Sequence, residues 1–312
     1  MTETEVYEEL RPLMFSIAYR MLGSASEAED IVQDAFLRFH QASKDQEIGN
    51  VKAYLAQITT RLSIDHLRSA RVRRESYTGT WLPEPLLTEQ VPDASQHAET
   101  ADSLSTAFLV LLESLSPVER AVFLLREVFD YPYEEIAETI GKSEDNTRQL
   151  AVRARRHVED RRPRFEADKK ARDELAGRFF EAAEEGDTEG LMKLLADDVV
   201  FYGDGGGKGP AIAKPVYGRE KVFRFLMGLL TQVGRMNVVL EPAEVNGGPG
   251  AVSRDPEGNI VSVLSMQIAD GQIQSMSSVV NPDKLAHLGP VGDLGELLQR
   301  SRDERRERAE RS

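Results

Sequence analysis

The chain has 312 residues, 40% of them hydrophobic and 29% charged, which is the composition of a soluble protein too long for one typical domain. It has no cysteine and five scattered histidines, which excludes disulfides and thiolate zinc sites and leads us to expect no metal or cofactor. The acidic N-terminus and the lack of an apolar run of about 20 residues argue against a secretory signal and a membrane span, so we expect a cytoplasmic protein with no membrane partner.

Residues 1–75 have the apolar spacing of three helices. Ser26 followed by Glu29 has the pattern of a capping box and predicts the start of the second helix. The third helix is expected from Val51 to about Arg74.

Residues 76–100 are predicted to be a linker. The prolines of Trp81-Leu82-Pro83-Glu84-Pro85 prevent a regular helix there. Trp81 is the only tryptophan of the chain, and a side chain with so much apolar area is expected to dock on another part of the protein.

Residues 101–165 are predicted to be a second helical segment that includes a helix-turn-helix. The first of its two helices begins at Tyr133 and ends before Gly141, which can take the left-handed conformation of a turn. Ser143 is a good N-cap for the second helix, which is expected to run to Val158.

The second helix of this motif has two different faces. Its apolar face is formed by Thr147, Leu150, Ala151, Ala154 and Val158. Its opposite, polar face carries Arg148, Gln149, Val152, Arg153 and Arg156. Such a helix suits the major groove of DNA, where arginine pairs with guanine and glutamine with adenine. The alternative is a solvated basic helix in an ordinary bundle.

Two arginine clusters stand out in a chain whose formal net charge is −14. From Arg61 to Arg74 there are five arginines and one aspartate, a local charge of +4, and from Arg148 to Arg164 there are seven arginines and two acids, a local charge of +5. Two basic patches on an acidic body indicate two DNA contacts on one carrier.

Residues 170–290 change from a helical to a mixed pattern. Helices are expected at 175–183, 188–195 and 221–230, and strands at 199–202, 238–245, 260–269 and 272–280. Asp270-Gly271 predicts a hairpin turn. Helices followed by an antiparallel meander indicate an α+β domain. Residues 291–312 form a charged C-terminal tail, and from Ser301 onward we expect disorder or a frayed helix.

The segment Ala28-Glu29-Asp30-Ile31-Val32-Gln33-Asp34-Ala35-Phe36 resembles the region 2.2 signature of the extracytoplasmic-function (ECF) sigma factors. In that family this helix docks on the β′ clamp helices of core RNA polymerase, which implies contacts by Asp30, Gln33 and Asp34. The simpler alternative is that these acids only interact favourably with the helix dipole.

The third helix and the helix-turn-helix extend the resemblance. Arg61-Leu62-Ser63-Ile64-Asp65-His66-Leu67-Arg68 is similar to regions 2.3 and 2.4, which implies binding of the −10 promoter element by Arg61, Arg68, Arg71, Arg73 and Arg74. For Asp65, a salt bridge to Arg61 or Arg68 is the simpler expectation. The helix-turn-helix resembles region 4.2, which implies that its polar face reads the −35 element. The implied partners are promoter DNA and core polymerase, through its β′ and β subunits.

Three further motifs resemble the SigJ-like subgroup, whose members carry a fused SnoaL-like domain. The residues of these motifs are Trp81, Pro83, Glu84, Pro85, Asp204, Gly205, Gly206, Gly207, Lys208, Asn281, Pro282, Asp283 and Lys284. The resemblance implies two all-α sigma domains and a cone-shaped α+β domain with a curved antiparallel sheet. It also implies that this domain regulates the sigma domains in cis, without a separate anti-sigma protein.

Contact between the linker and the third domain is also expected on physical grounds. The glycine run permits another backbone to approach closely. Asp204 is expected to accept hydrogen bonds from the linker, and Lys208 and Lys284 to meet Glu84. A phosphate-binding loop is the alternative for the glycine run, but the run lacks the Gly-Lys-Ser/Thr ending.

SnoaL-type domains include enzymes that use pocket carboxylates as bases. Asp204 and Asp270 are the candidates here, and each has a structural explanation, so we expect no enzyme activity. An apolar pocket for a small ligand, lined by residues such as Phe201, Phe223, Phe225 and Met266, is a hypothesis from fold analogy alone. The rival functions are a stand-alone helix-turn-helix regulator with a ligand domain, and an enzyme fused to a DNA-binding arm.

Overall fold

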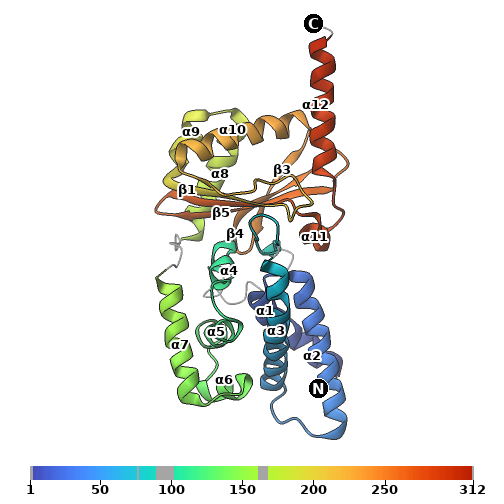
Figure 1. The fold of residues 1–312 in the computed structure, drawn as a ribbon, viewed down its shortest axis with the longest axis vertical. Helices are drawn as coiled ribbons and strands as arrows, with labels where there is room; N and C mark the ends of the chain where they lie inside the picture. The colour runs from blue at the N-terminus through green and yellow to red at the C-terminus, as the bar shows by residue number, and fades with distance from the viewer. Residues whose placement is uncertain (1–2, 76, 89–101, 161–167, 311–312) are drawn as a thin grey trace. The chain divides into compact units, whose positions relative to one another are not determined.

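The computed structural model describes residues 3–75, 77–88, 102–160 and 168–310, and within these ranges the side chains of 3, 70–75 and 308–310 lie outside the description. The chain forms two compact units (Figure 1). The first contains residues 1–76 and 91–163, and the second contains residues 77–90 and 164–312.

The first unit begins with three helices that pack on one another: α1 (Glu3–Leu22), α2 (Ala25–Asp45) and α3 (Val51–Glu75). The predicted start of the second helix at Ser26 and Glu29 is wrong. Gly23 takes a left-handed conformation with φ 67° and ends α1, which leaves Ser24 extended as the N-cap of α2. The Ser24 hydroxyl accepts a hydrogen bond from the Glu27 amide at 3.1 Å.

The remaining helices of this unit include the predicted helix-turn-helix. They are a short 3₁₀ helix (Asp102–Leu104), α4 (Thr106–Leu112), α5 (Pro117–Phe123), a π-helical turn (Leu124–Val128), α6 (Tyr133–Ile140) and α7 (Glu144–Glu159). Gly141, with φ 65°, ends α6, and the Ser143 hydroxyl caps α7, as predicted. Val122, Ile136 and Leu150 share the apolar cluster that holds α5, α6 and α7 together.

Two buried arginines connect the N-terminal helices to the second helical segment. Arg20 of α1 is 1% exposed and donates from Nε to the Ser103 hydroxyl at 3.0 Å. Its burial lowers the pKa of the guanidinium to about 10. Arg120 of α5 donates to the carbonyl of Met21 and pairs with Glu113, both at 2.7 Å. These polar contacts, which are costly to break in a buried setting, fix how the two helical segments pack.

The second unit is built on a six-stranded sheet with the strand order β2-β1-β6-β5-β4-β3. Its elements are α8 (Lys169–Glu185), α9 (Thr188–Leu194), β1 (Leu195–Asp204), β2 (Val216–Tyr217), α10 (Arg219–Arg235), β3 (Val239–Val245), β4 (Gly248–Arg254), β5 (Ile260–Ala269), β6 (Gln272–Val279), α11 (Pro282–Leu285), a 3₁₀ turn (Ala286–Leu288) and α12 (Leu294–Glu310).

The sheet confirms the α+β class and changes two details. The expected antiparallel arrangement holds for every pair except β1 and β6, which are parallel. The chain reaches β6 through the meander of β3, β4 and β5, which begins at the far edge of the sheet. The strands β2 and β4 were not predicted. The hairpin at Asp270 and Gly271 is present, and both residues have positive φ (53° and 67°), as a tight two-residue turn requires. The charged tail forms α12 as far as Glu310.

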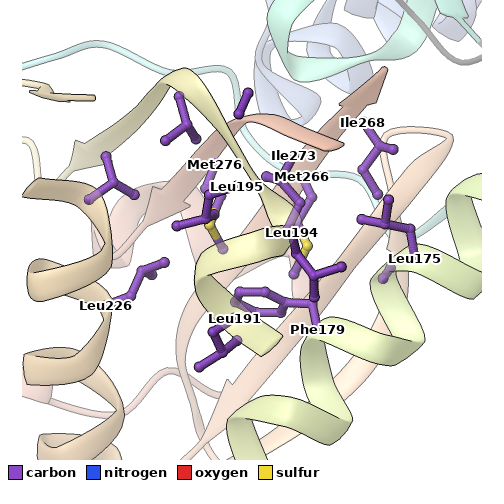
Figure 2. Close-up of a cluster of buried hydrophobic side chains, with 14 of the residues drawn as sticks. Leu175, Phe179, Leu191, Leu194, Leu195, Leu226, Met266, Ile268, Ile273 and Met276 are labelled. Atoms are coloured by element: carbon purple, nitrogen blue, oxygen red, sulfur yellow. The ribbon is translucent and has the colours of Figure 1, made fainter. Parts of the chain in front are cut away.

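One face of the sheet is covered by α8, α9 and α10, and the main apolar core lies between these helices and the sheet (Figure 2). Figure 2 shows Phe179 of α8 and Leu191 of α9 pointing towards the sheet, where Met266, Ile273 and Met276 complete the cluster. At the other end of the unit, Leu297 and Leu298 of α12 pack in a smaller cluster.

Residues 77–88 belong to the second unit and form part of its interior. Leu82 and Leu87 are buried in an apolar cluster with residues of the sheet such as Val252 and Val263. Leu87 also forms an isolated antiparallel bridge with Val245 at the end of β3. The linker therefore supplies core side chains to a domain that lies about 100 residues later in the chain.

Candidate functional sites

The second helix of the helix-turn-helix, α7, has the two faces that the sequence predicts. Thr147, Leu150, Ala151, Ala154 and Val158 are buried, and Arg148, Gln149, Val152, Arg153 and Arg156 are exposed. Val152 is 48% exposed, which is unusual for a valine in a helix of a packed unit and suits an apolar contact in a DNA groove.

Two arginines of α7 are held by neighbouring residues. Arg148 forms an ion pair with Glu144, and its guanidinium lies 4.5 Å from the centre of the Tyr133 ring. Arg155 lies 2.6 Å from Glu127, whose hydrogen bond raises the pKa of the guanidinium. Arg153 and Arg156 have no ion pair with any described residue, so their guanidinium groups are available to a ligand.

The predicted polymerase-binding residues form one exposed stripe on α2. Asp30, Gln33 and Asp34 are exposed, while Ile31, Val32 and their apolar neighbours are buried against α1 and α3. Within the described residues, none of the three has an ion pair or a side-chain hydrogen bond. The stripe is therefore free to bind a basic surface.

Leu37 continues this stripe one turn further and was not predicted from the sequence. Its side chain is 60% exposed. It lies beside a surface hollow of about 470 Å³ that is also lined by Tyr7, Gln33 and Phe36. The signal in the sequence is its helical spacing from Asp30, seven residues earlier, which places an apolar residue on the polar side of the helix.

The predicted −10 residues of α3 are placed differently from one another. Arg61 donates from Nε to the Thr139 carbonyl at 2.9 Å and from Nη2 to the Glu138 carbonyl at 2.8 Å, so it caps the C-terminal end of α6. Arg68 is exposed and pairs with Asp65 at 3.2 Å, the intrahelical salt bridge expected for that aspartate. Arg71, Arg73 and Arg74 have side chains outside the described residues.

Asp204, at the end of β1, is the centre of the linker site. Its side chain is 0% exposed. Oδ1 accepts from the Tyr77 hydroxyl at 2.5 Å and from the Gly206 amide at 3.1 Å, and Oδ2 accepts from the Leu82 amide at 2.8 Å. The expected capping of linker donors by Asp204 is present, and a buried carboxylate with these partners is satisfied.

Lys284 of α11 supplies the opposite charge. Its Nζ lies 2.7 Å from Asp204 Oδ2 and also donates to the Leu82 carbonyl. The same ammonium group lies 4.8 Å from the centre of the Tyr77 ring and 4.5 Å from the Trp81 ring. Two aromatic rings of the linker therefore surround a cation of the C-terminal domain, an arrangement that is stabilising when the cation is shielded from water.

Tyr77 is also held by Asn281, whose side-chain amide donates to the phenol oxygen at 3.0 Å. Burial, followed by the hydrogen bond to Asp204, raises the pKa of the Tyr77 phenol above its usual range. The phenol therefore stays protonated and acts as a donor to the carboxylate.

The glycine run lies against the linker at short range. A Cβ atom on Gly206 would lie 2.2 Å from the Asn281 amide nitrogen and 3.0 Å from the Tyr77 oxygen, and a Cβ on Gly207 would lie 3.3 Å from Thr78. Both glycines have positive φ, at 57° and 75°. The predicted close approach of a second backbone is therefore replaced by close packing of the side chains of Tyr77, Thr78 and Asn281, which leave no room for a side chain at Gly206.

The predicted pairing of Lys208 with Glu84 is wrong. Lys208 lies 2.5 Å from Asp283 on the surface, while the buried Glu84 lies 3.9 Å from His287 Nδ1. His287 Nε2 also contacts the Pro85 carbonyl at 2.8 Å. The contact of His287 with the linker was not predicted, because the sequence around His287 has no motif that indicates a binding role.

The second unit has a partly open cavity of about 400 Å³ that is lined by residues of α10, the sheet and α12. Phe201 and Phe225 line it, with ring centres 4.8 Å apart, whereas Phe223 and Met266 pack in the core instead. The polar side chains that line it are three serines, Gln232 and Arg302. Asp204 and Asp270 lie elsewhere, so the described residues of the cavity wall include no carboxylate or imidazole to act as a base.

In the described part of the chain, no helix combines the length and the apolar character needed to cross a bilayer.

Comparisons with known proteins agree with this arrangement. Family models match for sigma-70 region 2 at residues 6–73, sigma-70 region 4 at residues 105–158 and a SnoaL-like domain at residues 176–276. The chain is 38% identical to the ECF RNA polymerase sigma factor SigJ of Mycobacterium tuberculosis, over 90% of this chain and 93% of the relative. It is 32% identical to the probable ECF RNA polymerase sigma factor SigI of the same species, over 88% and 92%. The crystal structure of the M. tuberculosis SigJ protein matches with a TM-score of 0.73 and 35% identity, over 91% of this chain and 98% of that one.

Proposed function

Because the chain belongs to the ECF RNA polymerase sigma factors, we propose that it gives core polymerase promoter specificity and that its C-terminal domain regulates this activity in cis by holding the linker. In this proposal α2 binds the β′ clamp helices, α3 binds the −10 element and α7 reads the −35 element.

The exposed surfaces support these roles. The acidic stripe of Asp30, Gln33 and Asp34 has no partner among the described residues and faces solvent, as a docking surface must. On α7, exposed Arg153 and Arg156 can bind base edges or phosphates without first breaking an ion pair.

The single observation that carries the regulatory proposal is the buried pair of Asp204 and Lys284 around the linker backbone at Leu82. The linker joins region 2 to region 4, so fixing residues 77–88 in the C-terminal domain shortens the chain that remains free to span the two regions. A shorter free linker restricts how far the two DNA-binding regions can separate. In this proposal the C-terminal domain restrains the sigma regions in the way that a separate anti-sigma protein restrains other sigma factors. We propose that this protein requires no separate anti-sigma protein.

For the C-terminal domain we propose binding and not catalysis. Its cavity wall offers serine hydroxyls, one amide and one guanidinium, and none of these is a general base near neutral pH.

Run-off transcription tests both parts of the proposal. Core polymerase with the full-length protein should start at a defined promoter, and core polymerase alone should not; equal start-site selection in the two reactions would contradict the sigma function. The variant D204N should change the amount of transcript at equal protein concentration, because losing the ion pair with Lys284 weakens the hold of the C-terminal domain on the linker. If D204N releases the linker and transcription is nevertheless unchanged, cis regulation through the linker is wrong while the sigma function stands.

A further inference from the structure

We propose that the C-terminal domain binds an amphiphilic anion, with its apolar part in the cone cavity and its anionic group on a cluster of arginines contributed mainly by α12. The binding is a property of the second unit and does not depend on the transcription function.

The cavity has the size and chemistry of a small-molecule site. Its volume of about 400 Å³ lies within the range of roughly 300–1,000 Å³ typical of ligand pockets. Ile212, Phe225, Leu229 and Leu264 line it and are only partly buried, so apolar surface faces a partly open hollow. Covering that surface with an apolar ligand is favourable by the hydrophobic effect.

A second, smaller hollow of about 210 Å³ adjoins the cavity and is basic. The two hollows share Gln232, Leu298 and Arg302 in their walls. The smaller one is also lined by Arg235, at the C-terminal end of α10, and by Arg305 and Arg306 of α12. A ligand that fills the cavity can therefore reach four guanidinium groups at its rim.

The charge on α12 is divided between two faces. Leu298, Arg302, Arg305 and Arg306 recur at helical spacing on the face towards the hollow, and none of the acids Asp303, Glu304 and Glu307 lines either hollow. Figure 1 shows α12 rising past the end of α10, so this face continues from the cavity beyond the sheet.

Within the described side chains, the rim arginines have no paired counter-charge. Arg235, Arg302, Arg305 and Arg306 form no ion pair with the carboxylates that the structure describes. By contrast Arg300, on the other side of the same helix, pairs with Glu296 at 2.6 Å. Four like charges around one hollow repel each other, and an anion placed among them removes that repulsion and gains charge-assisted hydrogen bonds.

These features define the ligand as an apolar chain or ring system with one terminal anionic group, for which a ten-carbon carboxylate is a suitable probe. A neutral molecule of the same length would use the cavity but not the arginines.

Isothermal titration calorimetry of the full-length protein with decanoate, 1-decanol and decyl phosphate tests the proposal. Decanoate should bind at least about tenfold more tightly than 1-decanol, and decyl phosphate shows whether the rim prefers the larger anion. The variant R302Q/R305Q should weaken decanoate binding about tenfold or more and leave 1-decanol unchanged. The variant R300Q, which alters a paired arginine on the other face, is the matched control and should bind like the wild type.

The cavity itself is tested by L230W, which fills the space from α10, and by A211F, which fills it from an exposed loop and is less demanding on folding. Either substitution should abolish binding of both decanoate and 1-decanol while the circular dichroism spectrum stays native. Equal affinity for decanoate and 1-decanol, or insensitivity to R302Q/R305Q, would overturn the anionic half of the proposal. No binding of any of the three probes, or full binding by both filled variants, would overturn the site.

Discussion

Replacing Asp204 with asparagine changes one atom and removes the negative charge that pairs with Lys284. Oδ1 accepts from Tyr77 and Gly206, and Oδ2 accepts from Leu82 and Lys284. Whichever way the asparagine amide is turned, its NH₂ group faces two donors. Asp204 is 0% exposed and Lys284 is 7% exposed, so water does not reach the site to replace the lost hydrogen-bond partner.

Removing one partner of a buried ion pair costs about 3–5 kcal/mol. We therefore expect D204N to lower the free energy of unfolding of the second unit by about this amount, unless the linker leaves the site at a smaller cost. Release of the linker moves Trp81, the only tryptophan, away from the Lys284 ammonium, whereas destabilisation with the linker in place lowers the resistance of the second unit to urea. The fluorescence of Trp81 should shift to longer wavelength, or the urea midpoint should fall.

The matched control is D283N, which breaks the pair with Lys208, where both side chains are about 60% exposed. A surface pair of this kind contributes about 0–1 kcal/mol. If D204N has the emission spectrum of the wild type and loses less than about 1 kcal/mol, the linker site does not depend on this ion pair and the reasoning fails.

Three other predictions concern the remaining surfaces. The double variant D30A/D34A should weaken binding to core polymerase in a pull-down while circular dichroism stays native, because Asp30 and Asp34 are exposed and have no described partner. The variant R153A should weaken binding to the cognate −35 DNA by about 1–3 kcal/mol in a fluorescence-anisotropy titration, with a smaller loss on scrambled DNA. Raising the pH above about 10 should destabilise the linker site, because the unfolded chain then releases the Tyr77 proton that the folded protein retains. Trp81 emission between pH 8 and pH 11 measures this loss.

Each of these predictions has a control in the same element. D45A changes an exposed acid at the end of α2 and should leave polymerase binding intact; an equal loss would point to net charge and not to the stripe. R155A removes an arginine held by Glu127, and a loss on specific DNA as large as that of R153A would contradict the assignment of the reading face. Y77F should flatten the alkaline transition of Trp81, and an unchanged transition would assign it to another group.

The sequence predicts the helical parts of the fold well because their signals are local. Gly141, Ser143 and the two faces of α7 are determined by turn geometry, capping and a 3.6-residue period, and the structure confirms all three. The start of α2 was missed because two serines compete, and only the conformation of Gly23 decides that Ser24 is the cap.

Contacts between residues far apart in the sequence are harder to predict, because periodicity and capping carry no information about them. The contact between Asp204 and the linker was expected because the motifs that contain Asp204 and Trp81 resemble those of the SigJ-like subgroup, and because a buried carboxylate needs hydrogen-bond donors. The partner of Arg61 lies 78 residues away on α6, and no periodicity indicates it. The strand β4 was missed because its glycines and proline have low strand propensity, and it forms through pairing with β3 and β5 on either side.

The presence of Leu82 and Leu87 inside the C-terminal domain affects how such a protein can be divided. A fragment that starts after region 4 lacks two leucines of its own interior and should be prone to aggregate, whereas co-expression with a peptide of residues 77–88 should restore solubility. A chimera that takes its C-terminal domain from a relative would lack the same two leucines. The linker segment between the two promoter-binding regions must therefore be transferred together with the domain. The folded unit of the C-terminal domain therefore consists of two separate segments of the chain, and no single cut releases it whole.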